Sequence, residues 1–142
     1  MHRTLGTFGV TVAVESQLRP SERHDVTEVM VDPDALLTWI PRSVLESLGV
    51  KARKMVKFVT ADGGEITRYT GFVILHAAGT HTADEVVFAE PGDRILLGAR
   101  SLSGLNLKVD PAGRRLVPRG PILAAVSRRV AVAPRSSGAM VS

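Results

Sequence analysis

Asp32 is the residue of this chain whose surroundings best suit acid–base chemistry. It follows an apolar run over residues 29–31 and precedes Pro33, Asp34 and Ala35. An apolar strand that ends in an acidic residue delivers a carboxylate to a partly buried place, where ionisable groups are costly and often functional. The pattern therefore predicts a functional carboxylate at the end of a strand.

Two further segments contain residue types that could belong to the same site. Residues 61–64 read Ala-Asp-Gly-Gly between two stretches of strand periodicity. Glycine supplies the positive φ that a tight hairpin turn needs, so a β-hairpin is expected with Asp62 in its turn. Residues 95–98 read Ile-Leu-Leu-Gly, which predicts a short buried run.

The periodicity around these segments predicts the strands that hold them. Apolar and polar residues alternate along much of the chain, which is typical of half-buried strands. A valine-rich chain with 13 glycines and 8 prolines also favours β structure. Strands are expected over residues 5–15, 27–32, 56–60, 66–76, 82–89 and 105–109, with a last short one at 116–117.

The segments between these strands predict a polar loop and two short helices. Residues 16–26 are polar and without periodicity, so a loop is expected there. Pro41 is a favoured first helical residue, and the short helix that it begins should stop at Gly49. A helical turn is expected over residues 99–104. Together these elements predict a mostly β fold, a small β-barrel with two short helices.

Length and composition exclude several classes of protein. A chain of 142 residues can bury one real core but is too short for two domains of ordinary size. The absence of cysteine excludes disulfides and thiolate metal sites. No apolar run is long enough to cross a bilayer. We expect a cytoplasmic protein with no membrane partner.

The positive charge of the chain is concentrated near its C-terminus. The net charge is +4, and no acidic residue follows Asp110, whereas six arginines do. Without those six arginines, residues 1–110 carry a net charge of −2. We therefore expect a folded body over residues 1–118 and a basic, flexible extension over residues 119–142. A basic tail aids solubility or loose electrostatic contact, which does not favour specific nucleic-acid binding.

The order of these segments resembles the retropepsin-like (retroviral-type) aspartic peptidases, and their small prokaryotic members in particular. The resemblance covers residues 5–118 and depends on order and spacing more than on any one motif. The residues that carry it are Val31-Asp32 with Ala35 and Pro41, Ala61-Asp62-Gly63-Gly64, Ile95-Leu96-Leu97-Gly98 with Leu102, and the closing Val109-Asp110-Pro111 and Arg115-Leu116-Val117-Pro118.

The resemblance implies a closed acid-protease β-barrel that acts on a peptide or protein substrate. Each chain would supply one catalytic aspartate, Asp32, so a homodimer is needed to bring two together. The two carboxylates would share one proton and hydrolyse a peptide bond by acid–base catalysis. No cofactor or metal is implied. Substrate-binding residues would be Asp34, Ala35, Ala61, Asp62, Gly63 and Gly64, the last four in a flap, with Pro33, Leu96, Leu97 and Gly98 supporting the site.

Two residues differ from the family's pattern, in which Thr or Ser and then Gly follow the catalytic aspartate. Pro33 and Asp34 occupy those positions here. Proline has neither the hydroxyl nor the N–H that would lock two such loops together across the dimer axis. Asp34 adds bulk and a second carboxylate where the backbone should pass close to its symmetry mate.

Several hypotheses are therefore open for the Asp32 segment. The chain is an active aspartic endopeptidase, or it is a catalytically inactive peptide-binding or dimerisation module of the same fold. A third hypothesis is cation binding by Asp32 and Asp34, because clustered carboxylates suit Ca²⁺ or Mg²⁺. The plainest alternative is a polar turn at a strand end.

Other polar residues are predicted to be structural. His76 and His81 flank a hairpin turn without a third ligand marked in the sequence, so no metal site is expected there. Ser101 has no evident base partner, which predicts a polar residue of the helical turn and not a nucleophile.

Overall fold

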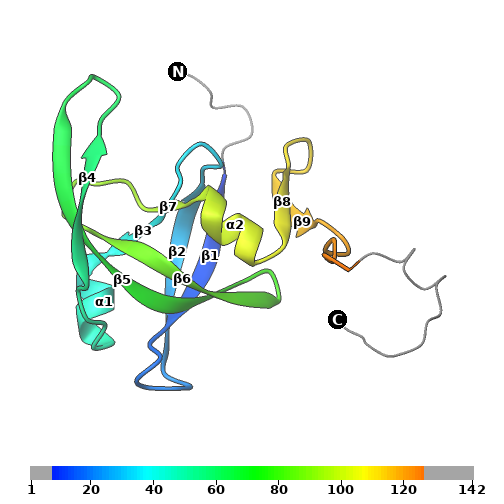
Figure 1. The fold of residues 1–142 in the computed structure, drawn as a ribbon, viewed down its shortest axis with the longest axis horizontal. Helices are drawn as coiled ribbons and strands as arrows, with labels where there is room; N and C mark the ends of the chain where they lie inside the picture. The colour runs from blue at the N-terminus through cyan, green and yellow to red at the C-terminus, as the bar shows by residue number, and fades with distance from the viewer. Residues whose placement is uncertain (1–7, 127–142) are drawn as a thin grey trace, which may run out of the picture.

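Residues 8–126, the part of the chain that the computed structural model describes, contain nine strands and two short helices (Figure 1). The mostly β fold with two short helices is therefore confirmed. The strands are β1 Gly9–Glu15, β2 Arg23–Val31, β3 Thr38–Pro41, β4 Lys54–Val59, β5 Glu65–Ala77, β6 Thr80–Ala89, β7 Leu96–Leu97, β8 Leu107–Asp110 and β9 Arg115–Pro118. The helices are α1 Arg42–Ser47 and α2 Ala99–Gly104.

Seven of the strands form one sheet in the order β1-β2-β7-β3-β6-β5-β4. β1 also pairs with β5, where Ala13 lies opposite His76, so six strands form a ring and β4 lies outside it. Most pairs are antiparallel, but β2 with β7 and β3 with β6 are parallel. The short β7 lies between β2 and β3, two consecutive strands that both come far before it in the sequence.

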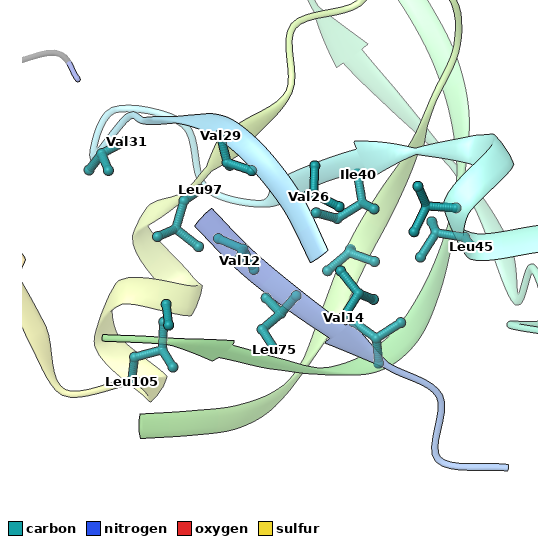
Figure 2. Close-up of a cluster of buried hydrophobic side chains, with 14 of the residues drawn as sticks. Val12, Val14, Val26, Val29, Val31, Ile40, Leu45, Leu75, Leu97 and Leu105 are labelled. Atoms are coloured by element: carbon teal, nitrogen blue, oxygen red, sulfur yellow. The ribbon is translucent and has the colours of Figure 1, made fainter. Parts of the chain in front are cut away.

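The hydrophobic core lies inside this ring of strands (Figure 2). Along β1 and the second half of β5, buried residues alternate with less buried ones, because successive side chains of a strand lie on opposite faces. The labelled side chains of Figure 2 come from β1, β2, β3, β5, β7 and the region of both helices. The fully buried members include Val12, Val14, Val29, Val31, Ile40, Leu45, Leu75, Leu97 and Leu105.

The first helix begins one residue later than expected. Pro41 is the last residue of β3 and the N-cap of α1, with ψ near 132°, so the helix starts at Arg42 and not at Pro41. Its end is as predicted, because Gly49 has a φ of +74° and donates its N–H to the carbonyl of Glu46. The helical turn expected over residues 99–104 is α2.

Two expectations about the strands are wrong. The loop expected over residues 16–26 ends earlier, because β2 starts at Arg23. The first three residues of β2 are polar and exposed, and they are held in the sheet by pairing with β1. β3 was not expected at all, although it is four residues long and closes the ring between β7 and β6. Residues 5–7 of the first expected strand lie outside the described residues.

A separate two-stranded sheet, β8 with β9, completes the body (Figure 1). The chain stays attached to it past Pro118, because Arg119 donates its N–H to the carbonyl of Asn106 at 2.9 Å and Asn106 donates to the carbonyl of Gly120 at 2.8 Å. Most of the expected basic extension, residues 127–142, lies outside the described residues. Within residues 8–126, neither helix has the length and apolar character needed to cross a membrane.

Candidate functional site

Asp32 is the first residue of the loop between β2 and β3, here called the Asp32 loop (residues 32–37). The residue before it, Val31, is fully buried in the core, whereas Asp32 is half-buried and Pro33 and Asp34 are exposed. The apolar strand therefore delivers its carboxylate to the edge of the core, as the sequence predicted.

The short strand β7 holds both ends of the Asp32 loop. It pairs with β2 on one side, where Val31 lies opposite Leu97, and with β3 on the other, where Trp39 lies opposite Leu96. The Asp32 N–H donates to the carbonyl of Leu97 at 3.0 Å. Two further N–H groups just after β7 donate into the loop, from Ala99 to Ala35 at 2.7 Å and from Arg100 to Leu36 at 3.0 Å. The structure thus brings Leu96, Leu97 and Gly98 together with the Asp32 loop.

Gly98 lets the two segments approach this closely. A Cβ built on it would lie 2.5 Å from the carbonyl oxygen of Leu37 and 2.8 Å from that of Ala35. Those atoms are backbone and cannot rotate away. The need for glycine at position 98 is therefore one of space, since its φ of −94° is open to any residue.

The carboxylate of Asp32 is turned toward the backbone of its own loop. The Asp34 N–H donates to Asp32 Oδ1 at 3.0 Å, and the Ala35 N–H donates to the Asp32 carbonyl at 3.2 Å. Pro33 has no N–H to donate. The Asp-Pro-Asp segment is therefore a side-chain-capped turn in which one oxygen of Asp32 already accepts a hydrogen bond.

A buried chain of hydroxyl groups lies behind the loop, and sequence reasoning missed it. Thr38 Oγ1 lies 2.6 Å from Ser101 Oγ, and Ser101 Oγ donates to Asp84 Oδ2 at 2.8 Å. Thr38 and Ser101 are fully buried. Thr38 also accepts the N–H of Gly98 at 2.9 Å. The one signal in the sequence is that Thr38 lies in an apolar stretch, where a buried hydroxyl must find a partner.

The hairpin tip at residues 61–64 forms as expected, with Gly63 at a φ of +89°. Asp62 accepts hydrogen bonds from the Thr60 hydroxyl and the Gly64 N–H, and both lower the pKa of its carboxyl. The hollow beside the tip is lined by residues 60–62 and 64–66. Figure 1 shows the tip of the β4–β5 hairpin well apart from the Asp32 loop, so one chain does not bring Ala61–Gly64 together with Asp32.

An ion pair connects this hairpin to the segment that leads into β7. Arg68 in β5 donates from Nε and Nη2 to the two carboxylate oxygens of Asp93, at 2.7 and 2.9 Å. Both side chains are largely buried, and Asp93 also accepts the N–H of Glu90. The hydrogen bond from Arg68 is the main cause that lowers the pKa of the Asp93 carboxyl. The base of the hairpin is therefore fixed relative to residues 93–97.

A second pair of titratable groups lies at the far end of the ring. His76 Nε2 lies 2.7 Å from Glu15 Oε1, and the ring of His76 is 5.5 Å from that of His81. The hydrogen bond to His76 is the largest of the effects that lower the pKa of Glu15. In residues 8–126, no group of three or more His, Cys, Asp or Glu is arranged to hold a metal ion. This gives the cation hypothesis for Asp32 and Asp34 no support.

No protein-family model matches the chain, and no curated protein matches it. The function of the protein must therefore be inferred from its residues and their geometry.

Proposed function

We propose that the chain is one subunit of a homodimeric, retropepsin-like aspartic endopeptidase, with its ring of strands as the closed barrel of that family. The observation that carries the proposal is the placement of β7 between β2 and β3, with Leu97 accepting the N–H of Asp32. A polar turn at a strand end needs no such support from a segment about 65 residues later in the chain. The arrangement instead favours a loop built to hold one carboxylate in a fixed position.

The proposed chemistry needs the Asp32 carboxylates of two subunits, one ionised and one protonated. The ionised carboxylate removes a proton from a water molecule whose oxygen attacks the peptide carbonyl carbon, while the protonated one gives its proton to the carbonyl oxygen. The resulting gem-diol returns a proton to the amide nitrogen and the C–N bond breaks. A carboxylic acid and an amine leave, and the pair again holds one proton.

The hairpin tip would cover the substrate in that dimer. Ala61, Asp62, Gly63 and Gly64 are exposed and lie at the end of a long two-stranded ribbon anchored at its base by Arg68 and Asp93. A tip held only at its base can close over a bound peptide and exclude water. The proposed substrate is accordingly an extended peptide or an unfolded protein.

A second candidate function, an inactive peptide-binding or dimerisation module of the same fold, is favoured by the turn itself. The Asp34 N–H donates a hydrogen bond to Asp32 Oδ1, so that oxygen already has a partner within its own loop. Pro33 has no hydroxyl to donate across the dimer axis. Two chains would also place four carboxylates near one axis, where like charges repel.

Cleavage of an unfolded protein by the full-length chain, at acid and neutral pH and with or without pepstatin, separates these functions. Asp32→Asn should abolish cleavage, whereas Asp25→Asn, which changes an exposed carboxylate on β2, the strand that leads into the Asp32 loop, should not. Cleavage that survives Asp32→Asn, or a chain that stays monomeric at micromolar concentration while active, would refute the proposal. If the wild type is inactive and Pro33→Thr with Asp34→Gly restores cleavage, the inactive module is correct.

A further inference from the structure

Three polar side chains from three different elements meet behind the Asp32 loop. Thr38 begins β3, Ser101 lies in α2 and Asp84 lies in β6, and the hydroxyls of Thr38 and Ser101 are fully buried. Burying two hydroxyls is costly unless every donor is satisfied. The contacts between these groups are therefore expected to have a defined direction.

The direction follows from counting protons. Ser101 has one hydroxyl proton and gives it to Asp84 Oδ2 at 2.8 Å, so the 2.6 Å contact between Thr38 and Ser101 must be a donation from Thr38. Thr38 in turn accepts the N–H of Gly98. The result is one chain of hydrogen bonds that runs from Gly98 through both hydroxyls and ends on the carboxylate of Asp84. Asp84 is itself fixed by the N–H of Glu85 at 2.8 Å.

The Leu97–Gly98 peptide group connects this chain to Asp32. Its N–H donates to Thr38 Oγ1 at 2.9 Å, and its carbonyl accepts the N–H of Asp32 at 3.0 Å. A peptide group is planar, so fixing its N–H also fixes the direction of its carbonyl. The orientation of the Asp32 backbone therefore depends on Thr38, Ser101 and Asp84.

We propose that Thr38, Ser101 and Asp84 are positioning residues that hold Asp32 in place from within each chain. This internal connection does not need a hydroxyl at position 33, which Pro33 lacks. The catalytic consequence rests on the proposed peptidase function, but the positioning of Asp32 can be measured without it.

Amide hydrogen exchange of the full-length chain tests the positioning directly. Thr38→Val removes the hydroxyl and leaves the Gly98 N–H without its buried partner, so the Asp32 amide should exchange about tenfold faster or more. Amides at the centre of the β5–β6 pairing should change much less. Thr38→Ser should restore protection of the Asp32 amide. Ser103→Ala, which changes an exposed serine on α2, the helix that also contains Ser101, should leave that protection unchanged. Ser101→Ala breaks the same chain one step further along and serves if Thr38→Val does not fold.

Equal acceleration of all slowly exchanging amides would show a merely structural role and would overturn the proposal. An unchanged Asp32 amide in folded Thr38→Val and Ser101→Ala would overturn it as well. In an active dimer, Thr38→Val should lower kcat about tenfold or more with little change in KM, and Thr38→Ser should recover it. If the wild type is inactive but Thr38→Val selectively accelerates exchange of the Asp32 amide, the peptidase proposal is refuted and the positioning proposal stands.

Discussion

Replacing Gly98 by alanine should disturb the close contact between β7 and the Asp32 loop. The added Cβ would lie 2.5 Å from the carbonyl oxygen of Leu37, against about 3.4 Å for ordinary contact, so the loop must move by about 0.9 Å. Such a movement lengthens the bond from Ala99 to Ala35, now 2.7 Å. Overpacking of this kind costs about 1–3 kcal/mol of unfolding free energy.

Urea denaturation followed by the fluorescence of Trp39, the single tryptophan, measures this cost. Trp39 lies in β3 opposite Leu96 and so reports on the strand that leaves the loop. A loss of about 2 kcal/mol should lower the urea midpoint by about 1 M. Gly64→Ala is the matched control, because a Cβ there meets only the side chains of Thr60 and Asp62, at 3.2 and 3.4 Å.

Equal stability of Gly98→Ala and Gly64→Ala, to within about 0.5 kcal/mol, would contradict the tight contact at Gly98. A destabilised Gly98→Ala whose Asp32 amide keeps its wild-type exchange rate, relative to the rest of the ring, would contradict it as well. In the first case the loop is not packed as tightly as described, and in the second the strain is relieved away from the site.

Two further predictions concern the core and the hairpin base. Leu97→Ala, at a fully buried side chain of β7, should cost about 2–5 kcal/mol in urea unfolding, whereas Leu36→Ala, at a 62% exposed side chain of the adjoining Asp32 loop, should cost less than about 0.5 kcal/mol. Equal costs would contradict the assignment of β7 to the core. The pKa of Asp93 is lowered in the folded state, so its ionised form stabilises the fold above its unfolded pKa, and this contribution disappears as the pH falls through the lower folded value. Thermal melts should therefore lose stability below about pH 4, and Asp93→Asn and Arg68→Met should both flatten that loss; unchanged acid profiles would show that the ion pair does not contribute.

The sequence predicted those parts of the fold that local chemistry determines. The β4–β5 hairpin was predictable because Gly63 supplies a positive φ in the turn. The end of α1 was predictable because Gly49 does the same at a helix terminus. The burial of residues 96–98 was predictable because removing a short apolar run from water is favourable, whereas Ile95 is only partly buried.

The missed parts of the fold depend on pairing and not on local pattern. β3 has only four residues and ends in Pro41, a residue that also begins helices, so its strand character comes from its neighbours β6 and β7. The start of β2 at Arg23 was missed because its first residues show no alternation of apolar and polar side chains. Pairing with β1 holds them in the sheet.

The candidate site was only partly predictable for the same reason. The position of Asp32 at a strand end was readable from residues 29–35. The contacts among Thr38, Asp84 and Ser101 were not, because hydroxyl and carboxyl partners far apart in sequence carry no spacing signal. A buried hydroxyl in an apolar stretch can be suspected, but its partner emerges only when the ring is closed.

The insertion of β7 between β2 and β3 also determines when the site can form during folding. Met30 and Leu96 must meet across most of the body, and closing so long a loop costs entropy before the contact repays it. Hairpins such as β4–β5 and β5–β6 are local and form early. β7 can be added only when both of its neighbours are in place. We therefore expect the newly made chain to form the hairpin ribbon first and to order Asp32 last, so that the carboxylate reaches its final geometry only when the ring closes.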